Sequence, residues 1–287
     1  MYTKYIDSLS LWSDNAETEY IMGIKRTCYN GVYPFKIFPE KGLKEIEFHP
    51  ITIFYGGNGS GKTTLLNIIA EKLQIRRNSL FSSSAFFDDY VKHCEICGKH
   101  VPEESRILTS DDVFDYLIKA RAKNNSIDVR RAELFKEHTE RKYGGSSRLS
   151  SLSEFDEWEE NRQARKKTQS QFVRERIQAN VEMFSNGESA LKYFLDNVTE
   201  NALYLLDEPE NSLSIEFQIE LSNYIEASAS HYGCQFILST HSPVLLSMKN
   251  AVIYDLDSYP VETRSWTELD NVRRYFNFFE EHKDEFI

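Results

Sequence analysis

Cysteine is scarce in this chain, and long hydrophobic runs are lacking altogether. Four cysteines in 287 residues are too few for a disulfide-stabilised fold. No run approaches the ~18 consecutive apolar residues of a membrane helix. The first residues also lack the basic start and apolar run of a secretory signal. We therefore expect a cytoplasmic protein without membrane insertion.

Positive charge is also in short supply. The chain has 34 Lys and Arg against 45 Asp and Glu, a formal net charge of −11. Such a surface repels phosphates, which argues against a protein that coats nucleic acid with its whole surface. Residues 121–176 differ, because they hold 14 basic and 10 acidic residues, a net of +4 that leaves −15 for the rest. Solvated helix faces explain this segment as simply as a nucleic-acid contact does.

The order of apolar runs predicts an α/β fold with a mostly parallel sheet. Helical spacing in 62–73 and 215–229 alternates with short apolar runs that are typical of buried strands. These runs lie at 51–55, 202–206, 234–238 and 252–256. Antiparallel strands are expected near the N-terminus, from the alternation in 43–48 and from Asn30-Gly31, which favours a hairpin within 20–38.

The middle of the chain reads as helical. Capping residues and apolar spacing predict helices at 111–123 and 128–143 and a long charged one within 153–183. We therefore expect a single domain over 1–287. Its α/β body would comprise 1–75 and 200–287, and a mainly helical insertion would span 76–199.

A glycine-rich turn stands between the expected strand at 51–55 and the helix at 62–73. It fits the G-x-x-x-x-G-K-[ST] phosphate-loop pattern, in which backbone N–H groups and the helix N-terminus surround a phosphate. Lys62 then supplies a charge for the β- and γ-phosphates, and the Thr63 hydroxyl is placed for Mg²⁺. The loop reads Gly56, Gly57, Asn58, Gly59, Ser60, Gly61, Lys62, Thr63, followed by Thr64.

Two carboxylates follow the apolar run at 202–206. Asp207 and Glu208 come at the carboxyl end of a strand, where α/β sheets bind ligands. Asp207 is expected to reach Mg²⁺, and Glu208, which points elsewhere, to polarise an attacking water. Together with the phosphate loop they predict an ATP site.

Three further segments make the chain resemble the ATP-binding cassette (ABC) ATPase family. Residues 184–188, Phe-Ser-Asn-Gly-Glu, look like a degenerate form of the family signature, although a plain helix cap explains the same letters. Residues 210–214, Glu-Asn-Ser-Leu-Ser, resemble its D-loop, and His241 within 239–243, Ser-Thr-His-Ser-Pro, matches its switch histidine. No glutamine occupies a clear Q-loop position.

The resemblance implies roles for these residues. Lys62, Glu208 and His241 would be catalytic, and Thr63 and Asp207 would hold Mg²⁺. ATP would lie between the phosphate loop of one copy and Ser185, Gly187 and Glu188 of a second, which implies a homodimer closed by ATP. Within the family the chain looks more like the soluble branch that includes SMC, RecF and OLD-type ATPases and the ATPases of anti-phage defence.

The resemblance leaves two functions open. One is an ATP-driven switch in DNA repair or defence, which acts with a separate effector such as a nuclease or toxin, or on nucleic acid through residues 162–176. The alternative is the ATPase subunit of a membrane transporter. Little chain remains for an effector domain, which favours a separate partner.

Cys94 and Cys97 form a Cys-x-x-Cys-Gly turn of the kind that presents two thiolates to Zn²⁺. A tetrahedral site needs two more ligands, which His93, His100 or a second copy would supply. A reduced pair without metal is an equal alternative.

Overall fold

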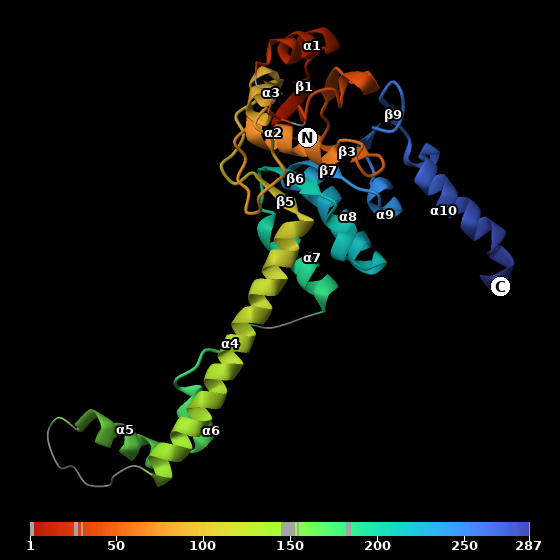
Figure 1. The fold of residues 1–287 in the computed structure, drawn as a ribbon. Coiled ribbons are helices and arrows are strands. Elements are labelled where there is room, and N and C mark those ends of the chain that lie inside the picture. Colours follow the sequence, from red (N-terminus) through yellow and green to blue (C-terminus); the bar gives the residue numbers. More distant parts are fainter. Residues whose placement is uncertain are drawn as a thin grey trace. The chain divides into compact units, whose positions relative to one another are not determined.

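A computed structural model describes residues 3–25, 28–29, 31–144, 153, 155–181 and 185–286. The chain forms two compact units (Figure 1). Unit 1 comprises residues 1–114 and 185–287, and unit 2 comprises residues 115–184.

Unit 1 is built on a six-stranded sheet, in which every neighbouring pair is parallel except β8 and β9. The predicted α/β class is thereby confirmed, as are the four strands expected from apolar runs. These strands are mainly apolar because the sheet is covered on both faces, and all five residues of β3 and of β7 are buried. In spatial order the strands are β5 (Arg106–Thr109), β6 (Leu203–Asp207), β7 (Gln235–Ser239), β3 (Ile51–Tyr55), β8 (Ala251–Asp255) and β9 (Glu262–Arg264).

A smaller antiparallel sheet packs on the same core. It consists of β2 (Glu45–Glu47), β1 (Ile6–Ser10) and β4 (Glu95–Gly98), in that order. The buried side chain of Gln235 joins the two sheets, because its Oε1 accepts hydrogen bonds from the backbone of Tyr5 and Ile6 and its Nε2 donates to the Ile6 carbonyl.

The expected hairpin within 20–38 is wrong, although Asn30 itself lies outside the described residues. Ser13 instead caps helix α1 (Asp14–Gly23) by accepting a hydrogen bond from the Ala16 N–H. The chain then turns through residues 33–38 into a short 3₁₀ helix, η1 (Pro39–Lys41). Aromatic packing overrides the local turn signal here, since Phe35 lies edge-on to Trp12 with ring centroids 5.3 Å apart.

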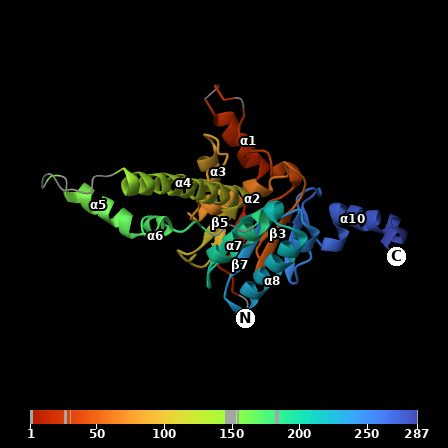
Figure 2. The same ribbon diagram turned by 90° about the horizontal axis from the view of Figure 1, so that it is seen from below.

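Helices cover the large sheet of unit 1 (Figure 2). Helix α2 is nearly all buried, because it runs from the carboxyl end of β3 through the core. No helix among the described residues is long and apolar enough to cross a membrane. The helices are α2 (Lys62–Lys72), α3 (Phe87–His93), α7 (Asn186–Asn197), α8 (Ile215–His231), α9 (Pro243–Leu246) and α10 (Asp270–Glu281), with 3₁₀ turns η3 (Pro209–Ser212), η4 (Trp266–Glu268) and η5 (Lys283–Phe286).

Unit 2 is helical and has a small core of its own, made by Leu134, Ala164, Phe172 and Val173. Helix α4 (Ser110–Tyr143) begins in unit 1 and continues into unit 2 without a break, so the two helices expected at 111–123 and 128–143 are one. The Asn124 side chain does not end the helix, because it accepts a hydrogen bond from the Val181 N–H and donates to the Val181 carbonyl.

Residues 153–183 form less helix than the sequence predicts. They form α5 (Phe155–Lys166) and α6 (Gln169–Arg174), separated where Thr168 starts a new helix with a capping box. Glu154, Met183 and the signature residue Phe184 lie outside the described residues.

Candidate functional site

The site lies at the carboxyl ends of three parallel strands of unit 1. Asp207 at the end of β6 is paired in register with Ser239 at the end of β7, and Ser239 is paired with Phe54 of β3. Because parallel strands end at the same edge, the phosphate loop after β3, the acids after β6 and the His241 segment after β7 lie together. The motifs predicted that the phosphate loop and the acids lie together, and the resemblance to the ABC family implied the place of the His241 segment.

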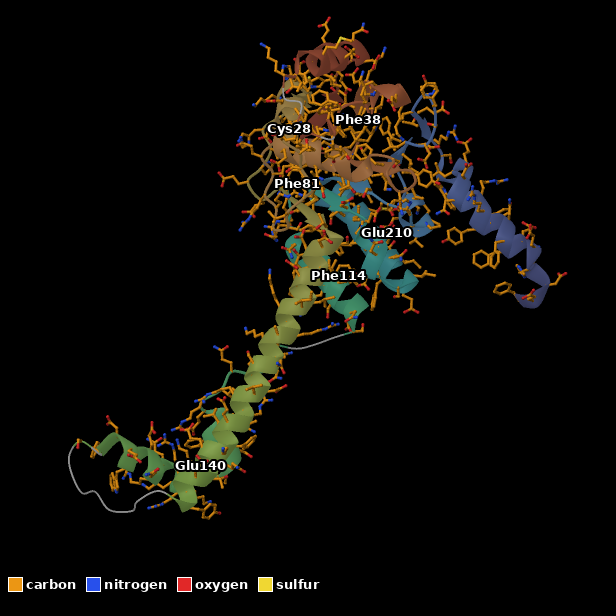
Figure 3. All side chains as sticks on the ribbon, in the orientation of Figure 1. Cys28, Phe38, Phe81, Phe114, Glu140 and Glu210 are labelled. Carbon is orange, nitrogen blue, oxygen red and sulfur yellow. The ribbon has the colours of Figure 1, made fainter. Side chains whose placement is uncertain are left out.

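Two glycines of the phosphate loop are needed for its shape. Gly61 precedes α2 with φ of 103°, and a Cβ there would approach Phe38 Cε1 to 3.0 Å and Ile37 Cγ2 to 3.2 Å. At Gly56 a Cβ would come within 2.7 Å of the Ser60 Oγ. Figure 3 labels Phe38 in the packed body of unit 1. The loop is therefore pressed closely against the residues that precede β2.

Lys62 is the most buried cation of the site, with 4% of its side chain exposed. Its Nζ donates to the carbonyls of Gly56 at 2.9 Å and Gly57 at 3.2 Å, and lies 3.6 Å from the Glu208 Oε1. These contacts hold the ammonium group at the mouth of its own loop, where a bound phosphate is able to exchange for the carbonyl partners.

One carboxylate oxygen of Asp207 joins β6 to helix α2 and to strand β7. This atom, Oδ1, accepts hydrogen bonds from the Thr63 hydroxyl at 3.0 Å and from the Ser239 hydroxyl at 2.5 Å. Burial raises the pKa of Asp207 above its ordinary value, although the bonds from Ser239 and Thr63 act in the opposite direction. Thr63 and Asp207 present the hard oxygen donors that Mg²⁺ prefers, so the residues fit that ion.

Glu208 is held in an uncommon backbone conformation, with φ of 47°. A left-handed conformation at a non-glycine residue costs on the order of 1 kcal/mol and is concentrated at functional sites. The Glu208 N–H donates to Ser239, which fixes the residue against β7.

The Glu208 carboxylate faces the two other charged groups of the site. Its Oε1 lies 3.3 Å from the His241 Nε2 and 3.6 Å from the Lys62 Nζ, and its Oε2 accepts from Asn211 at 3.0 Å. Burial alone would raise the pKa of Glu208, but the Asn211 bond and the Lys62 and His241 charges together lower it. The adjacent carboxylates thus have opposite shifts, because burial dominates at Asp207 and the hydrogen bond and neighbouring groups dominate at Glu208.

Glu210 is a functional candidate that the sequence analysis treated only as part of the D-loop (Figure 3). The residue is partly buried, and its Oε1 accepts from the His241 N–H at 2.6 Å and from the Thr240 hydroxyl at 2.7 Å. Burial raises the pKa of Glu210, against the effect of those two bonds. It thereby ties the segment after β6 to the histidine segment after β7.

Other residues at the site come from distant parts of the chain. A hollow of about 500 Å³ is lined by residues 58–64 and Glu208, and also by Tyr33 and Ile37. The Asp257 carboxylate accepts a hydrogen bond from the Gly57 N–H at 2.6 Å, and Asn271 of α10 donates to the His241 carbonyl at 3.3 Å. No motif marks these four residues.

The signature residues do not join this hollow within one copy. Ser185 is exposed and caps α7 by accepting from the Glu188 N–H at 3.2 Å. A Cβ on Gly187 would meet Phe217 at 3.1 Å and the Ser212 carbonyl at 3.3 Å, so this glycine allows α7 to approach α8 and η3. None of Ser185, Gly187 and Glu188 is among the described residues that line the hollow.

The structure does not support the zinc site. Cys94 is fully buried, and burial raises the pKa of its thiol to about 12, whereas Cys97 is exposed on β4. A buried thiol that stays protonated is not a zinc ligand, and the two sulfurs do not share a surface. Among the described residues, no group of three or more His, Cys, Asp and Glu side chains is arranged to hold a metal.

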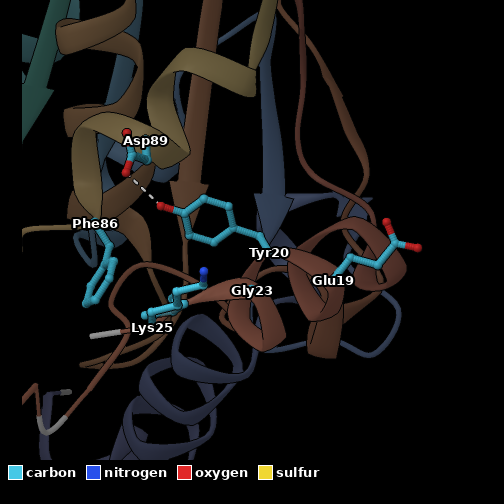
Figure 4. Close-up of a pocket in the computed structure, with 7 residues that line it drawn as sticks. Glu19, Tyr20, Gly23, Lys25, Phe86 and Asp89 are labelled. Atoms are coloured by element: carbon cyan, nitrogen blue, oxygen red, sulfur yellow. Dashed lines mark hydrogen bonds between the residues drawn. The ribbon is translucent and has the colours of Figure 1, made fainter. Parts of the chain in front are cut away.

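A second hollow of about 410 Å³ lies away from the strand ends, between α1 and α3 (Figure 4). The Tyr20 hydroxyl donates to the Asp89 Oδ2 across it at 2.6 Å. It shares no lining residue with the first hollow.

Family models match two parts of the chain. A model described as "ABC transporter" matches residues 45–211, and one described as "AAA domain, putative AbiEii toxin, Type IV TA system" matches residues 189–247. No curated protein sequence matches the chain.

Solved structures with a similar fold include three SMC heads. The Smc head domain with an extended coiled coil bound to the C-terminal domain of ScpA, from Pyrococcus furiosus, is 14% identical with a TM-score of 0.45, and the match covers 97% of this chain and 99% of that one. An SMC head bound to the C-winged helix domain of ScpA is 16% identical with a TM-score of 0.44 (92% and 99% covered). The SMC head domain from Thermotoga maritima is 14% identical with a TM-score of 0.41 (91% and 99% covered).

Proposed function

Because the chain belongs to the ABC family of ATPases, we propose that it binds and hydrolyses ATP and that this cycle joins and releases two copies of its head. The observation that carries the proposal is the convergence of Lys62, Glu208 and His241, with Glu208 Oε1 within 3.6 Å of both the Lys62 Nζ and the His241 Nε2. A base, a phosphate-binding cation and a γ-phosphate sensor thus stand around one position.

In the proposed reaction, the N–H groups of the phosphate loop and the start of α2 bind the β- and γ-phosphates. Lys62 exchanges its bonds with the Gly56 and Gly57 carbonyls for phosphate oxygens. Glu208, kept ionised by its lowered pKa, accepts a proton from the attacking water, and His241 donates a hydrogen bond to the γ-phosphate. Tyr33 also lines the hollow and is placed to contact the adenine base of ATP.

Mg²⁺ would be held by the Thr63 hydroxyl and Asp207, whose oxygens are 3.0 Å apart. When bound, it neutralises charge on the β- and γ-phosphates. The contribution of the chain is to position Thr63, because Asp207 is itself fixed by Ser239.

A second copy completes the site in this proposal. Ser185 and Gly187 do not line the hollow of their own copy, and Ser185 and Glu188 are exposed at the N-terminus of α7, where the positive end of the helix dipole attracts an anion. ATP would therefore bridge the loop of one head and α7 of another. Loss of the γ-phosphate removes the bridge and releases the heads.

Glu208→Gln tests this function. The variant should bind ATP but hydrolyse it at least ~10²-fold more slowly, because it lacks the general base. Sedimentation velocity should then show a further association that appears only when ATP and Mg²⁺ are added, measured against the same variant without nucleotide. Lys62→Ala is the matched control, since it should lose nucleotide binding by calorimetry and show no ATP-dependent change. A Glu208→Gln protein whose sedimentation is unaffected by ATP contradicts the proposal.

We further propose that the switch acts in DNA repair or anti-phage defence, together with an effector such as a nuclease or toxin. The toxin-related description of the family model at 189–247 supports the defence role. Any nucleic-acid contact would fall on the basic stretch at 162–176, where Lys166 and Arg174 are exposed.

The ATPase subunit of a membrane transporter is the second candidate, because the family model over 45–211 is described as "ABC transporter". Affinity purification from a native membrane extract separates the two: a membrane-spanning partner favours the transporter, and a nuclease or toxin favours the switch.

A further inference from the structure

Helix α10 carries a stripe of aromatic side chains that the rest of unit 1 leaves exposed. Leu269 and Val272 are buried at its start, but Tyr275, Phe276 and Phe279 are each about half exposed. These positions follow Val272 at intervals of three, four and seven residues, so they share one face. In Figures 1 and 2 the helix leads away from the sheet toward the chain end. An exposed aromatic stripe of this kind marks an interaction surface.

The aromatic stripe has positive charges at its start and negative charges at its end. Residues 273–281 read Arg-Arg-Tyr-Phe-Asn-Phe-Phe-Glu-Glu, so two cations precede Asn277, two carboxylates follow it, and aromatic residues stand between. Arg273 and Glu280 are seven residues apart and therefore lie on the same flank of the stripe. The exposed Arg273 has its guanidinium over the Phe276 ring, and neither it nor Glu280 forms an ion pair within the described residues.

This order of charged residues is unfavourable for an isolated helix. Glu280 and Glu281 stand in the last turn, beside the negative end of the helix dipole, where acidic residues are unfavourable. The same order becomes favourable when a second helix runs in the opposite direction, because its positive end and its arginines then face these carboxylates.

We propose that α10 pairs with α10 of a second copy of this chain, antiparallel, about a two-fold axis beside Asn277. Under a two-fold axis a contact from one residue to another is made twice. Arg273 then meets Glu280 of the second copy, Glu280 meets the second Arg273, and the two aromatic stripes cover each other. A parallel pair would instead bring Arg273 against Arg273, which charge repulsion disfavours.

The pairing surface connects to the candidate site through the first turn of α10. The Asn271 N–H donates to the Tyr55 hydroxyl at 3.1 Å, and its side chain donates to the His241 carbonyl. Pairing of α10 would therefore hold two copies together by the helices that support their His241 segments. It requires no nucleotide, and so it is separate from the ATP-dependent joining proposed above.

Charge reversal in the full-length chain tests the pairing. Sedimentation velocity without nucleotide, at up to about 100 µM so that weak association is also seen, should show a wild-type dimer. Arg273→Glu and Glu280→Arg should each raise the dimer dissociation constant at least ~10-fold, because each places like charges together twice. An equal mixture of the two variants should dimerise again, and the double variant R273E/E280R should recover the homodimer.

Folding and function have separate controls. Far-UV circular dichroism and ATP binding should match the wild type for every variant, and Phe276→Ser should weaken the dimer without any change of charge. A wild-type chain that is monomeric without nucleotide overturns the proposal, as does a dimer that the reversals leave unchanged. Capture of another protein by α10 without self-association also overturns it.

Separate variants distinguish a failure of the α10 pairing from a failure of the ATP-dependent joining. Lys62→Ala should keep the α10 dimer although it binds no ATP. Arg273→Glu combined with Glu208→Gln should still join with ATP, so that loss of one association leaves the other measurable.

Discussion

Different interactions stabilise each of the two units of the chain. In unit 1 whole strands are buried, and the charged groups of the candidate site gather where β3, β6 and β7 end. In unit 2 the buried apolar cluster has four residues, and exposed ion pairs such as Arg141 with Glu160 at 2.5 Å join its helices. Lys167 and Glu175 form another such pair.

The difference indicates a division of roles. The packed sheet of unit 1 fixes the strand ends, so charges there keep the separations that chemistry needs, and the pKa values of Asp207, Glu208 and Glu210 shift. The charges of unit 2 are mostly paired with each other on the surface, where each pair adds only about 0.2–1 kcal/mol of stability. Substitutions in one unit should therefore leave the properties of the other intact.

The largest expected effect comes from Asp207→Asn in unit 1. ATP turnover should fall by about 10³-fold or more, as when one charge that stabilises the transition state is removed. Hydrogen exchange in unit 2 should be unchanged. Phosphate release and exchange mass spectrometry measure both, and a loss of protection in unit 2 would break the comparison.

The same substitution should stabilise unit 1 without nucleotide. Because folding raises the pKa of Asp207, the ionised form is disfavoured in the folded state, and the wild type loses stability as pH rises from the ordinary value through the raised one. Asn keeps the Oδ1 acceptor without this cost, so its melting temperature should be higher at neutral pH, with the difference shrinking as pH falls. Glu208→Gln is the matched control with the opposite sign, because the Glu208 pKa is lowered and its stabilisation is lost only as pH falls through that lowered value.

Much of unit 1 was accessible from sequence because its signals are local. An apolar run followed by Gly56–Thr63, or by Asp207 and Glu208, identifies both a strand and its chemistry. The sequence did not predict Tyr33, Asp257 and Asn271 as site residues, because their contacts with the site join residues far apart in the chain. Gly57 and Asp257, for example, are 200 residues apart. The three residue types alone carry no signal.

The errors have physical causes of the same kind. Residues 111–143 were expected to form two helices, but they form one, and within it the Asn124 side chain bonds the Val181 backbone 57 residues away. The Cys-x-x-Cys pattern looked like a metal turn, but Cys94 belongs to the apolar core of unit 1. Tertiary packing decided both cases against the local pattern.

The next largest effect is expected from Phe172→Ala in unit 2. Phe172 is 1% exposed within the four-residue cluster, and such a truncation typically costs about 3–5 kcal/mol. Because α5 and α6 contribute three of the four residues of this cluster, they should lose protection from hydrogen exchange while basal ATP turnover stays at the wild-type level. Phe155→Ala is the control, since that side chain is half exposed and its loss should leave the protection of α6 nearly unchanged. Turnover that falls together with the protection of unit 2 would show that the units are not independent.

The smallest effect tests the charge contrast itself. If the exposed Lys166 and Arg174 of unit 2 contact duplex DNA, replacing both with Gln should weaken binding several-fold and reduce the slope of log affinity against log salt by about one for each lost phosphate contact. Melting temperature and basal ATP turnover should not change, because neither side chain is buried. Lys119→Gln is the matched control, since it removes a cation of α4 that already pairs with Asp115 and lies outside 162–176. Equal binding and equal salt slopes for all three proteins would show that the basic stretch is a solvated helix surface. The excess of positive charge in unit 2 would then have no nucleic-acid role.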